Sequence, residues 1–316
     1  MKIENLKGVV TKSTGSWYTV RTSEGELFEC RIKGKFRISG IKSTNPIAVG
    51  DIVEFDINEE DNTGVIHTLE PRKNHIIRKS TNLSKQTHIL ASNVDQAVMV
   101  VTLAAPKTYT AFIDRFLVTA EAYHIPAVLI FNKVDVYTEK EHEELNFLKS
   151  VYNRIGYDCY AGSVLEEDFI EEIRAVFKDK KTLLSGHSGV GKSTLANKID
   201  SKLDLKVSAI SDMHKTGKHT TTFAEMHPLE MGGYIIDTPG IKGFGIVEME
   251  KEELAHRFPE IRQHIHNCKF HNCHHINEPG CAVKEALING EIAEFRYENY
   301  LDMYFDEDDN YRPLGY

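Results

Sequence analysis

The sequence predicts a multidomain protein with an N-terminal β-barrel of the OB-fold type, a central α/β domain and a mainly helical C-terminal domain. Three observations predict this fold class: short strands at close spacing over residues 1–70, strands alternating with amphipathic helices over residues 93–245, and a helical, histidine- and cysteine-rich segment over residues 246–316. A polar stretch over residues 71–92 is expected to be a linker. The length of 316 residues suits two or three domains.

The composition is that of a globular protein, with 41% hydrophobic and 27% charged residues. It excludes disordered, collagenous and disulfide-scaffold classes. No apolar run is long enough to cross a membrane, and the first residues lack the apolar region of a signal peptide, so a cytoplasmic protein without a membrane partner is expected. Nothing in the sequence suggests an obligate dimer, and a monomer is expected.

The net charge of −9 argues against a simple basic nucleic-acid binder, but the charge is unevenly distributed. Residues 1–88 carry 14 Lys and Arg against 11 Asp and Glu, whereas residues 246–316 carry 7 against 15. A phosphate-facing surface is therefore expected toward the N-terminal side. Ordinary solvated charge explains the same imbalance equally well.

In the N-terminal segment, about five short strands within 70 residues fit a small barrel whose open face binds oligonucleotides in many proteins. A basic run with aromatic neighbours suits that use, although a solvated strand edge above core aromatics is the alternative. The expected strands include residues 17–21, 27–32, 51–57 and 64–69. The basic and aromatic residues are Trp17, Tyr18, Arg31, Lys33, Lys35, Phe36 and Arg37.

The central segment reads as a doubly wound parallel sheet with right-handed crossovers. Residues 97–103 and 127–131 are continuous apolar runs, as expected for strands buried on both faces. Apolar residues at helical spacing follow over 112–120, 145–155 and 169–177.

A phosphate-binding loop is predicted at residues 186–193, which match GxxxxGK[ST] between an apolar strand and a helix. Glycines let backbone N–H groups wrap the phosphates, and the helix N-terminus adds positive potential. Lys192 is expected to contact the β- and γ-phosphates and Ser193 to coordinate Mg²⁺. The loop and the residue after it are Gly186, His187, Ser188, Gly189, Val190, Gly191, Lys192, Ser193 and Thr194.

Two further motifs accompany the phosphate loop. Asp237 directly follows a strand expected over residues 234–236 and begins a DxxG motif, so its carboxylate can reach Mg²⁺ through water while the Gly240 N–H can be offered to the γ-phosphate. Asn132, Lys133 and Asp135 form an NKxD motif after another strand. A carboxylate at Asp135 can accept hydrogen bonds from the guanine N1–H and N2–H₂ groups, which selects GTP over ATP.

The order of these motifs indicates a circular permutation. Base recognition at 132–135 precedes the phosphate loop, which precedes DxxG, whereas ordinary GTPases begin with the phosphate loop. The DxxG motif therefore lies directly before the C-terminal segment.

The C-terminal segment contains a candidate metal site of three cysteines within 14 residues. Three thiolates and one imidazole complete a tetrahedral Zn²⁺ shell, which makes the site structural rather than catalytic. Unliganded cytosolic thiols and an Fe–S cluster are the alternatives, and His271 or His274 could compete with His275 for the fourth position. The leading ligand set is Cys268, Cys273, His275 and Cys281.

The combined pattern closely resembles the family of circularly permuted bacterial GTPases called ribosome small-subunit-dependent GTPase A. The resemblance covers the whole chain, including residues 217–222, and its pattern matches His275 as the fourth zinc ligand. It implies that Thr221, in switch I, senses Mg²⁺ and the γ-phosphate, and that Ser163 helps to hold the base. It also implies a GTPase that acts in late maturation of the small ribosomal subunit and binds that subunit and its rRNA.

The sequence departs from Ras-type GTPases at the position after DxxG, where Ile241 replaces the glutamine that orients the attacking water. The histidine suggested for this role in some family members is Glu248 here, which leaves His219 and His187 as weak candidates. Slow intrinsic hydrolysis completed by a partner is expected. The alternatives are a nucleotide-gated RNA-binding adaptor, in which turnover is incidental, and an unrelated P-loop ATPase or kinase, which the NKxD motif opposes.

Overall fold

The chain folds into two compact units, each assembled from several stretches of sequence. The first unit contains residues 1–97, 167–184 and 192–240, and the second contains residues 98–166, 185–191 and 241–316. Among the residues that the structure describes, no helix is both long and apolar enough to cross a membrane. The computed structural model describes residues 2–32, 46–58, 61–79, 87–203, 224–237 and 249–306.

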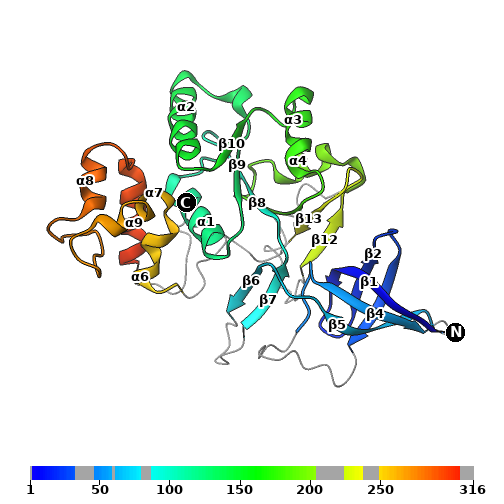
Figure 1. Ribbon diagram of the computed structural model, residues 1–316. Helices are drawn as coiled ribbons and strands as arrows, with labels where there is room; N and C mark the ends of the chain where they lie inside the picture. The colour runs from blue at the N-terminus through cyan, green and yellow to red at the C-terminus, as the bar shows by residue number, and fades with distance from the viewer. Residues whose placement is uncertain are drawn as a thin grey trace, which may run out of the picture. The chain divides into compact units, whose positions relative to one another are not determined.

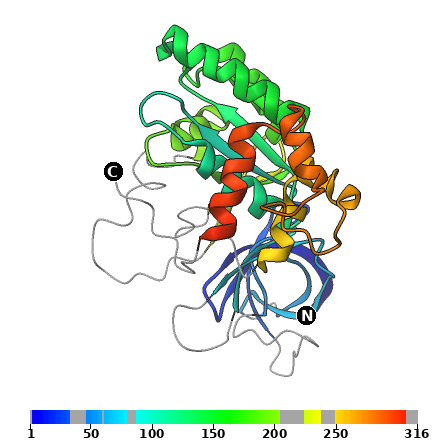
Figure 2. The same cartoon turned by 90° about the vertical axis from the view of Figure 1, so that its left-hand side faces the viewer.

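The first unit begins with a five-stranded barrel, which confirms the predicted OB-type start (Figure 1). The strands follow the order β1-β2-β3-β5-β4, and β4 pairs back onto β1 to close the barrel, whose strands curve into a ring in Figure 2. Burial alternates along β4, because successive side chains point into and out of the barrel. The strands are β1 (Lys2–Ser13), β2 (Tyr18–Thr22), β3 (Leu27–Ile32), β4 (Ile52–Asn58) and β5 (Thr63–Leu69).

The segment after the barrel is tied to it through the buried carboxylate of Asp51. This carboxylate accepts hydrogen bonds from the Arg72 guanidinium at 2.6 and 2.7 Å and from the Ser92 hydroxyl at 2.6 Å. Residues within the stretch expected to be a linker form a two-stranded antiparallel sheet of β6 (His75–Lys79) and β7 (Thr87–Ser92). The described residues of this segment are therefore held by a buried ion pair and by strand pairing.

The remaining strands of the first unit belong to the α/β domain and continue the sheet of the barrel. Their order is β11-β13-β12, and β12 pairs with β1 of the barrel at Lys12 and Glu225, which also form an ion pair at 3.3 Å. The two domains predicted from the sequence therefore share a sheet inside this unit. The elements are α3 (Glu167–Phe177), β11 (Lys181–Ser185), α4 (Lys192–Ile199), η2 (Ser201–Leu203), β12 (Glu225–Pro228) and β13 (Tyr234–Asp237).

The second unit contains the strand order β10-β9-β8, with β9 and β10 parallel and every residue of β8 buried. The buried faces of its helices are those that the apolar spacing predicts, because Phe116, Leu148 and Tyr152 all lie in the core. The elements are β8 (Gln96–Val101), which begins in the first unit, α1 (Thr110–Ala122), β9 (Ala127–Phe131), η1 (Val134–Val136), α2 (Glu139–Arg154) and β10 (Asp158–Ala161).

The C-terminal part of the second unit is helical, as predicted, and packs around Phe258, Ile261 and Tyr300. Helix α9 contacts α1, so this part and the α/β layer share a core. The elements are α6 (Lys251–Leu254), η3 (Ala255–Arg257), α7 (Pro259–Arg262), η4 (Ile265–Asn267), α8 (Ala282–Ile288) and α9 (Glu294–Phe305).

A buried ionic cluster fixes α9 against α1. Arg296 is fully buried and contacts Asp114 at 2.6 Å and Glu260 at 2.6 and 3.1 Å. Asn299 donates to the second Asp114 oxygen at 2.6 Å, and the Tyr152 hydroxyl donates to the first at 2.8 Å. Since charges in the interior require partners, this cluster specifies how the two helices meet.

Replacing Arg296 by methionine is expected to lower the free energy of unfolding by about 3–5 kcal/mol, because two buried carboxylates lose their cation. Arg262→Met is the matched control, since Arg262 is 48% exposed and its pair with Glu121 is worth about 0–1 kcal/mol. Urea denaturation measures both variants, and equal losses would show that the cluster contributes no more than a surface pair.

Candidate functional site

The predicted phosphate loop follows β11 and leads directly into α4, which begins at Lys192. Gly186 and Gly191 have φ values of +135° and +104°, which side chains rarely adopt. A Cβ at Gly186 would lie 2.4 Å from the Val100 carbonyl oxygen, and one at Gly191 would lie 2.4 Å from the Asn132 amide nitrogen. Glycine is therefore required at both positions, because any side chain would strain the backbone and would collide with a neighbouring atom.

The NKxD motif lies next to this loop in the second unit. Asn132 is fully buried; its amide nitrogen donates to the Val190 carbonyl at 2.8 Å, and its amide oxygen accepts from the Val164 N–H at 3.0 Å. The Lys133 ammonium donates to the Ala105 carbonyl at 2.7 Å, and Asp135 is exposed. The structure thus brings the predicted base-recognition loop and the phosphate loop together through one asparagine.

A third loop, after β10, completes this group. The Gly162 N–H donates to the Phe131 carbonyl at 3.0 Å, and the Gly162 carbonyl accepts from the Val134 N–H at 3.3 Å. Ser163 is 2% exposed, and its hydroxyl accepts from the Leu165 N–H at 3.3 Å. The Ser163 side chain therefore holds its own turn beside the base-recognition loop.

The predicted switch residues are only partly described. β13 ends at Asp237 and runs parallel to β11, with Ile236 opposite Leu183, so Asp237 lies at the carboxyl end of its strand. Thr221, His219 and Gly240 lie outside the described residues, as do Ile241, Glu248 and the basic residues Lys33, Lys35 and Arg37.

His187, the first residue after the leading glycine of the phosphate loop, stacks on Phe112 of α1. The two ring centroids are 3.9 Å apart and the rings are inclined by 24°. Sequence reasoning assigned Phe112 only to the apolar face of a helix. Its contact with the phosphate loop joins residues 75 positions apart, which no local spacing indicates.

The predicted metal ligands converge. One ligand atom from each of the four residues lies within 4.8 Å of every other. The His275 Nδ1 atom is 3.6 Å from the Cys268 sulfur and 3.5 Å from the Cys281 sulfur, and those two sulfurs are 4.0 Å apart. Metal–ligand distances of about 2.0–2.3 Å in a tetrahedron require separations close to these. The residues fit a structural Zn²⁺ ion.

The conformation of the metal loop is held by groups that the sequence did not reveal. His275 has a φ of +61°, and the Tyr297 hydroxyl donates to its carbonyl at 2.6 Å. The Tyr300 hydroxyl donates to the His274 carbonyl at 2.7 Å. Burial raises the pKa of Glu278, but hydrogen bonds from backbone N–H groups, among them those of His274 and Ile276, outweigh it and lower that pKa to about 2.

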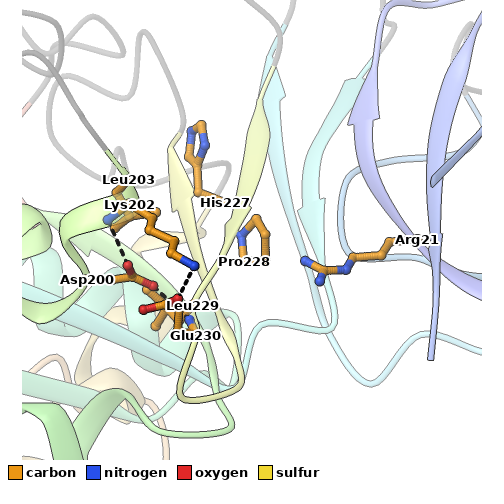
Figure 3. Close-up of a pocket in the computed structure, with 8 residues that line it drawn as sticks. All are labelled: Arg21, Asp200, Lys202, Leu203, His227, Pro228, Leu229 and Glu230. Atoms are coloured by element: carbon orange, nitrogen blue, oxygen red, sulfur yellow. Dashed lines mark hydrogen bonds and ion pairs between the residues drawn. The ribbon is translucent and has the colours of Figure 1, made fainter. Parts of the chain in front are cut away.

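A separate cavity of about 320 Å³ lies in the first unit, between strand β2 of the barrel and the β12–β13 hairpin (Figure 3). Its wall is ordered by Asp200, which accepts hydrogen bonds from the Lys202 and Glu230 N–H groups at 2.9 and 2.7 Å, while the Lys202 and Glu230 side chains form an ion pair. The lining residues are Arg21, Asp200, Lys202, Leu203, His227, Pro228, Leu229 and Glu230.

Two family models match the chain. The model described as RsgA GTPase matches residues 69–247, and the model described as RsgA N-terminal domain matches residues 7–66. The chain is 55% identical over 313 residues to the small ribosomal subunit biogenesis GTPase RsgA of Christiangramia forsetii, a match that covers 98% of this chain and 99% of that protein. It is 54% identical over 311 residues to the protein of that name from Bacteroides fragilis, covering 98% and 100%.

Two solved structures are similar along nearly the whole chain. YjeQ from Thermotoga maritima has a TM-score of 0.80 and 37% identity, covering 96% of this chain and 98% of its own. YloQ, described as a circularly permuted GTPase, has a TM-score of 0.76 and 29% identity, covering 97% of each chain. Together with the barrel and the Cys₃His cluster, these similarities confirm the predicted fold class, including its permuted order.

Proposed function

Because the chain belongs to the RsgA GTPase family, we propose that this GTPase binds the small ribosomal subunit, acts in its late maturation and leaves it after hydrolysing GTP. The observation that carries the proposal is the buried Asn132, whose two amide hydrogen bonds hold the base-recognition loop to the phosphate loop and to the Ser163 turn. A site for a guanine nucleotide needs these three loops in one place. The cytoplasm, where ribosomal subunits mature, is the proposed place of action.

The proposed roles of the site residues follow from their positions in the motifs. Asp135, which is exposed, accepts from the guanine edge, while Asn132 and Lys133 hold the loop that carries it. Lys192 neutralises charge on the β- and γ-phosphates. Ser193, Thr221 and Asp237 would hold Mg²⁺, which when bound would supply positive charge beside the phosphate oxygens. Backbone N–H groups over 186–194, together with Gly240, bind the phosphate oxygens.

The barrel and the metal-binding part are proposed to be the surfaces that dock on the subunit. On the barrel, the Arg31 guanidinium lies 3.7 Å from the centroid of the Trp17 ring, a pairing that offers a base or phosphate both charge and an aromatic face. The metal site, with one structural Zn²⁺ held by three thiolates and His275, would fix the shape of the second surface. The protein is proposed to act as a monomer.

The proposal predicts that purified small ribosomal subunits accelerate single-turnover hydrolysis of GTP by this protein, and that ATP is not hydrolysed. The physical reason is that Ile241 cannot orient the attacking water, so the partner has to supply or order that element. Tight binding to the subunit without acceleration would favour the second candidate, a nucleotide-gated RNA-binding adaptor, which the missing glutamine also supports. Equal use of ATP would exclude both candidates.

A further inference from the structure

Tyr137 lies two residues after the base-recognition loop and connects that loop to the segment that follows the neighbouring strand β8. Its side chain is 9% exposed, and its hydroxyl is hydrogen-bonded on both sides. The hydroxyl accepts from the Leu103 N–H at 2.8 Å and donates to the Asn132 carbonyl at 2.8 Å. The backbone N–H of Tyr137 donates to the Val134 carbonyl at 3.2 Å. Both its backbone and its side chain are therefore hydrogen-bonded to the base-recognition loop.

The carbonyl that Tyr137 holds belongs to the residue that organises the site. The side chain of Asn132 is bound to Val190 and Val164, and its N–H donates to the Val101 carbonyl at 2.8 Å. The Tyr137 hydroxyl supplies the partner for its remaining polar group, the carbonyl oxygen. Each polar atom of Asn132 therefore has at least one hydrogen-bond partner, as expected for a fully buried residue.

The peptide that follows this carbonyl turns sharply. Lys133 has a φ of +64°, a left-handed conformation that costs a non-glycine residue free energy. A hydrogen bond to the Asn132 carbonyl fixes the orientation of the peptide between Asn132 and Lys133. That orientation sets the course of the chain to Asp135, whose side chain is exposed two residues later.

We propose that Tyr137 is a positioning residue for guanine recognition, whose hydroxyl fixes the peptide between Asn132 and Lys133 and thereby presents Asp135 to the base. The inference rests on the proposed function, because it assumes that the NKxD loop binds guanine. Burial raises the pKa of Tyr137 to about 12, although the hydrogen bond from the Leu103 N–H opposes that rise. The hydroxyl thus keeps its proton, and can donate it to the carbonyl, throughout the physiological range of pH.

The test is Tyr137→Phe in the full chain, with GDP and ADP affinities measured by fluorescence titration. The variant leaves the Asn132 carbonyl and the Leu103 N–H without their partner, and we expect GDP affinity to fall about 10-fold. ADP affinity, which depends on the phosphate loop alone, should change less than about twofold. The preference for guanine therefore shrinks, and the KM for GTP rises while kcat at saturating GTP is retained.

Tyr152→Phe is the matched control, because it removes a buried hydroxyl from the same unit without touching the base-recognition loop. It should lower the midpoint of thermal unfolding and leave both affinities as they were. Unchanged GDP affinity in Tyr137→Phe, or an equal loss for GDP and ADP, would overturn the inference. An unmodified chain that binds GDP no better than ADP would instead refute the proposed function.

Hydrogen exchange provides a measurement on the unmodified chain that does not depend on the folding of the variant. If Tyr137 couples base binding to the end of β8, GDP should slow exchange at the Leu103 N–H more than ADP does at equal occupancy. Equal protection by the two nucleotides would contradict the inference.

Discussion

Replacing Lys192 by alanine is expected to lower the single-turnover rate of GTP hydrolysis by about 10²- to 10³-fold. Lys192 is the first residue of α4, where the phosphate loop meets the helix, and it is 8% exposed. An ammonium group there stabilises the charge that spreads over the γ-phosphoryl oxygens in the transition state. The backbone N–H groups remain in the variant, and nucleotide binding should weaken without being abolished.

The matched control is Lys198→Ala, which removes an exposed lysine from the same helix. Hydrolysis by this variant, measured with subunits present, should equal that of the unmodified protein. Normal turnover by Lys192→Ala would contradict the assignment of residues 186–193 as the phosphate loop.

Loss of the metal site is expected to have the second large effect, this time on folding. Cys281→Ser removes one of four ligands, and metal binding to such sites in zinc-finger peptides contributes about 10–16 kcal/mol to folding. Even a fraction of that free energy should lower the midpoint of thermal unfolding by about 10 °C. The loop held by Tyr297 and Tyr300 would then lack one of the four groups that could hold an ion.

Metal content, measured by atomic spectroscopy of the purified protein, distinguishes destabilisation by loss of a metal ion from destabilisation by loss of a thiol group alone. Cys159→Ser is the control, because Cys159 is half-buried in β10 and lies outside the cluster. One zinc per chain is expected in the control and none in Cys281→Ser. A fully stable Cys281→Ser protein without metal would show that the cluster has no structural role.

Much of the fold could be predicted because its signals are local. Four of the five barrel strands, β2 to β5, lie within a residue of the expected segments, whereas no segment was given for β1. Alternation of buried and exposed side chains leaves a two-residue period in the sequence of such strands. The sheet of β6 and β7 was not predicted, because what stabilises this polar segment is distant in sequence. Asp51 provides the anchor, and it lies 21 and 41 residues from Arg72 and Ser92.

The residues of the candidate site likewise fall into two groups, those that the sequence indicates and those that only the structure reveals. The glycines and lysine of a phosphate loop and the residues of an NKxD motif occur at fixed spacings, and so do cysteines and histidines that can bind one metal ion. Both groups could therefore be found in the sequence. Tyr137, Phe112, Tyr297 and Tyr300 act through contacts that the fold creates. A tyrosine that bridges two backbone groups leaves no periodic signal, and only the structure distinguishes it from a core aromatic.

The pairing of β12 with β1 has a consequence for the order of synthesis. The two residues that meet, Lys12 and Glu225, are 213 positions apart, so the ribosome completes the barrel long before the partner strand emerges. Contacts so distant form late, because closing the intervening chain costs conformational entropy. During translation the nascent barrel therefore leaves this part of β1 unpaired, and it can be protected from pairing with another molecule only after residue 225 has been synthesised.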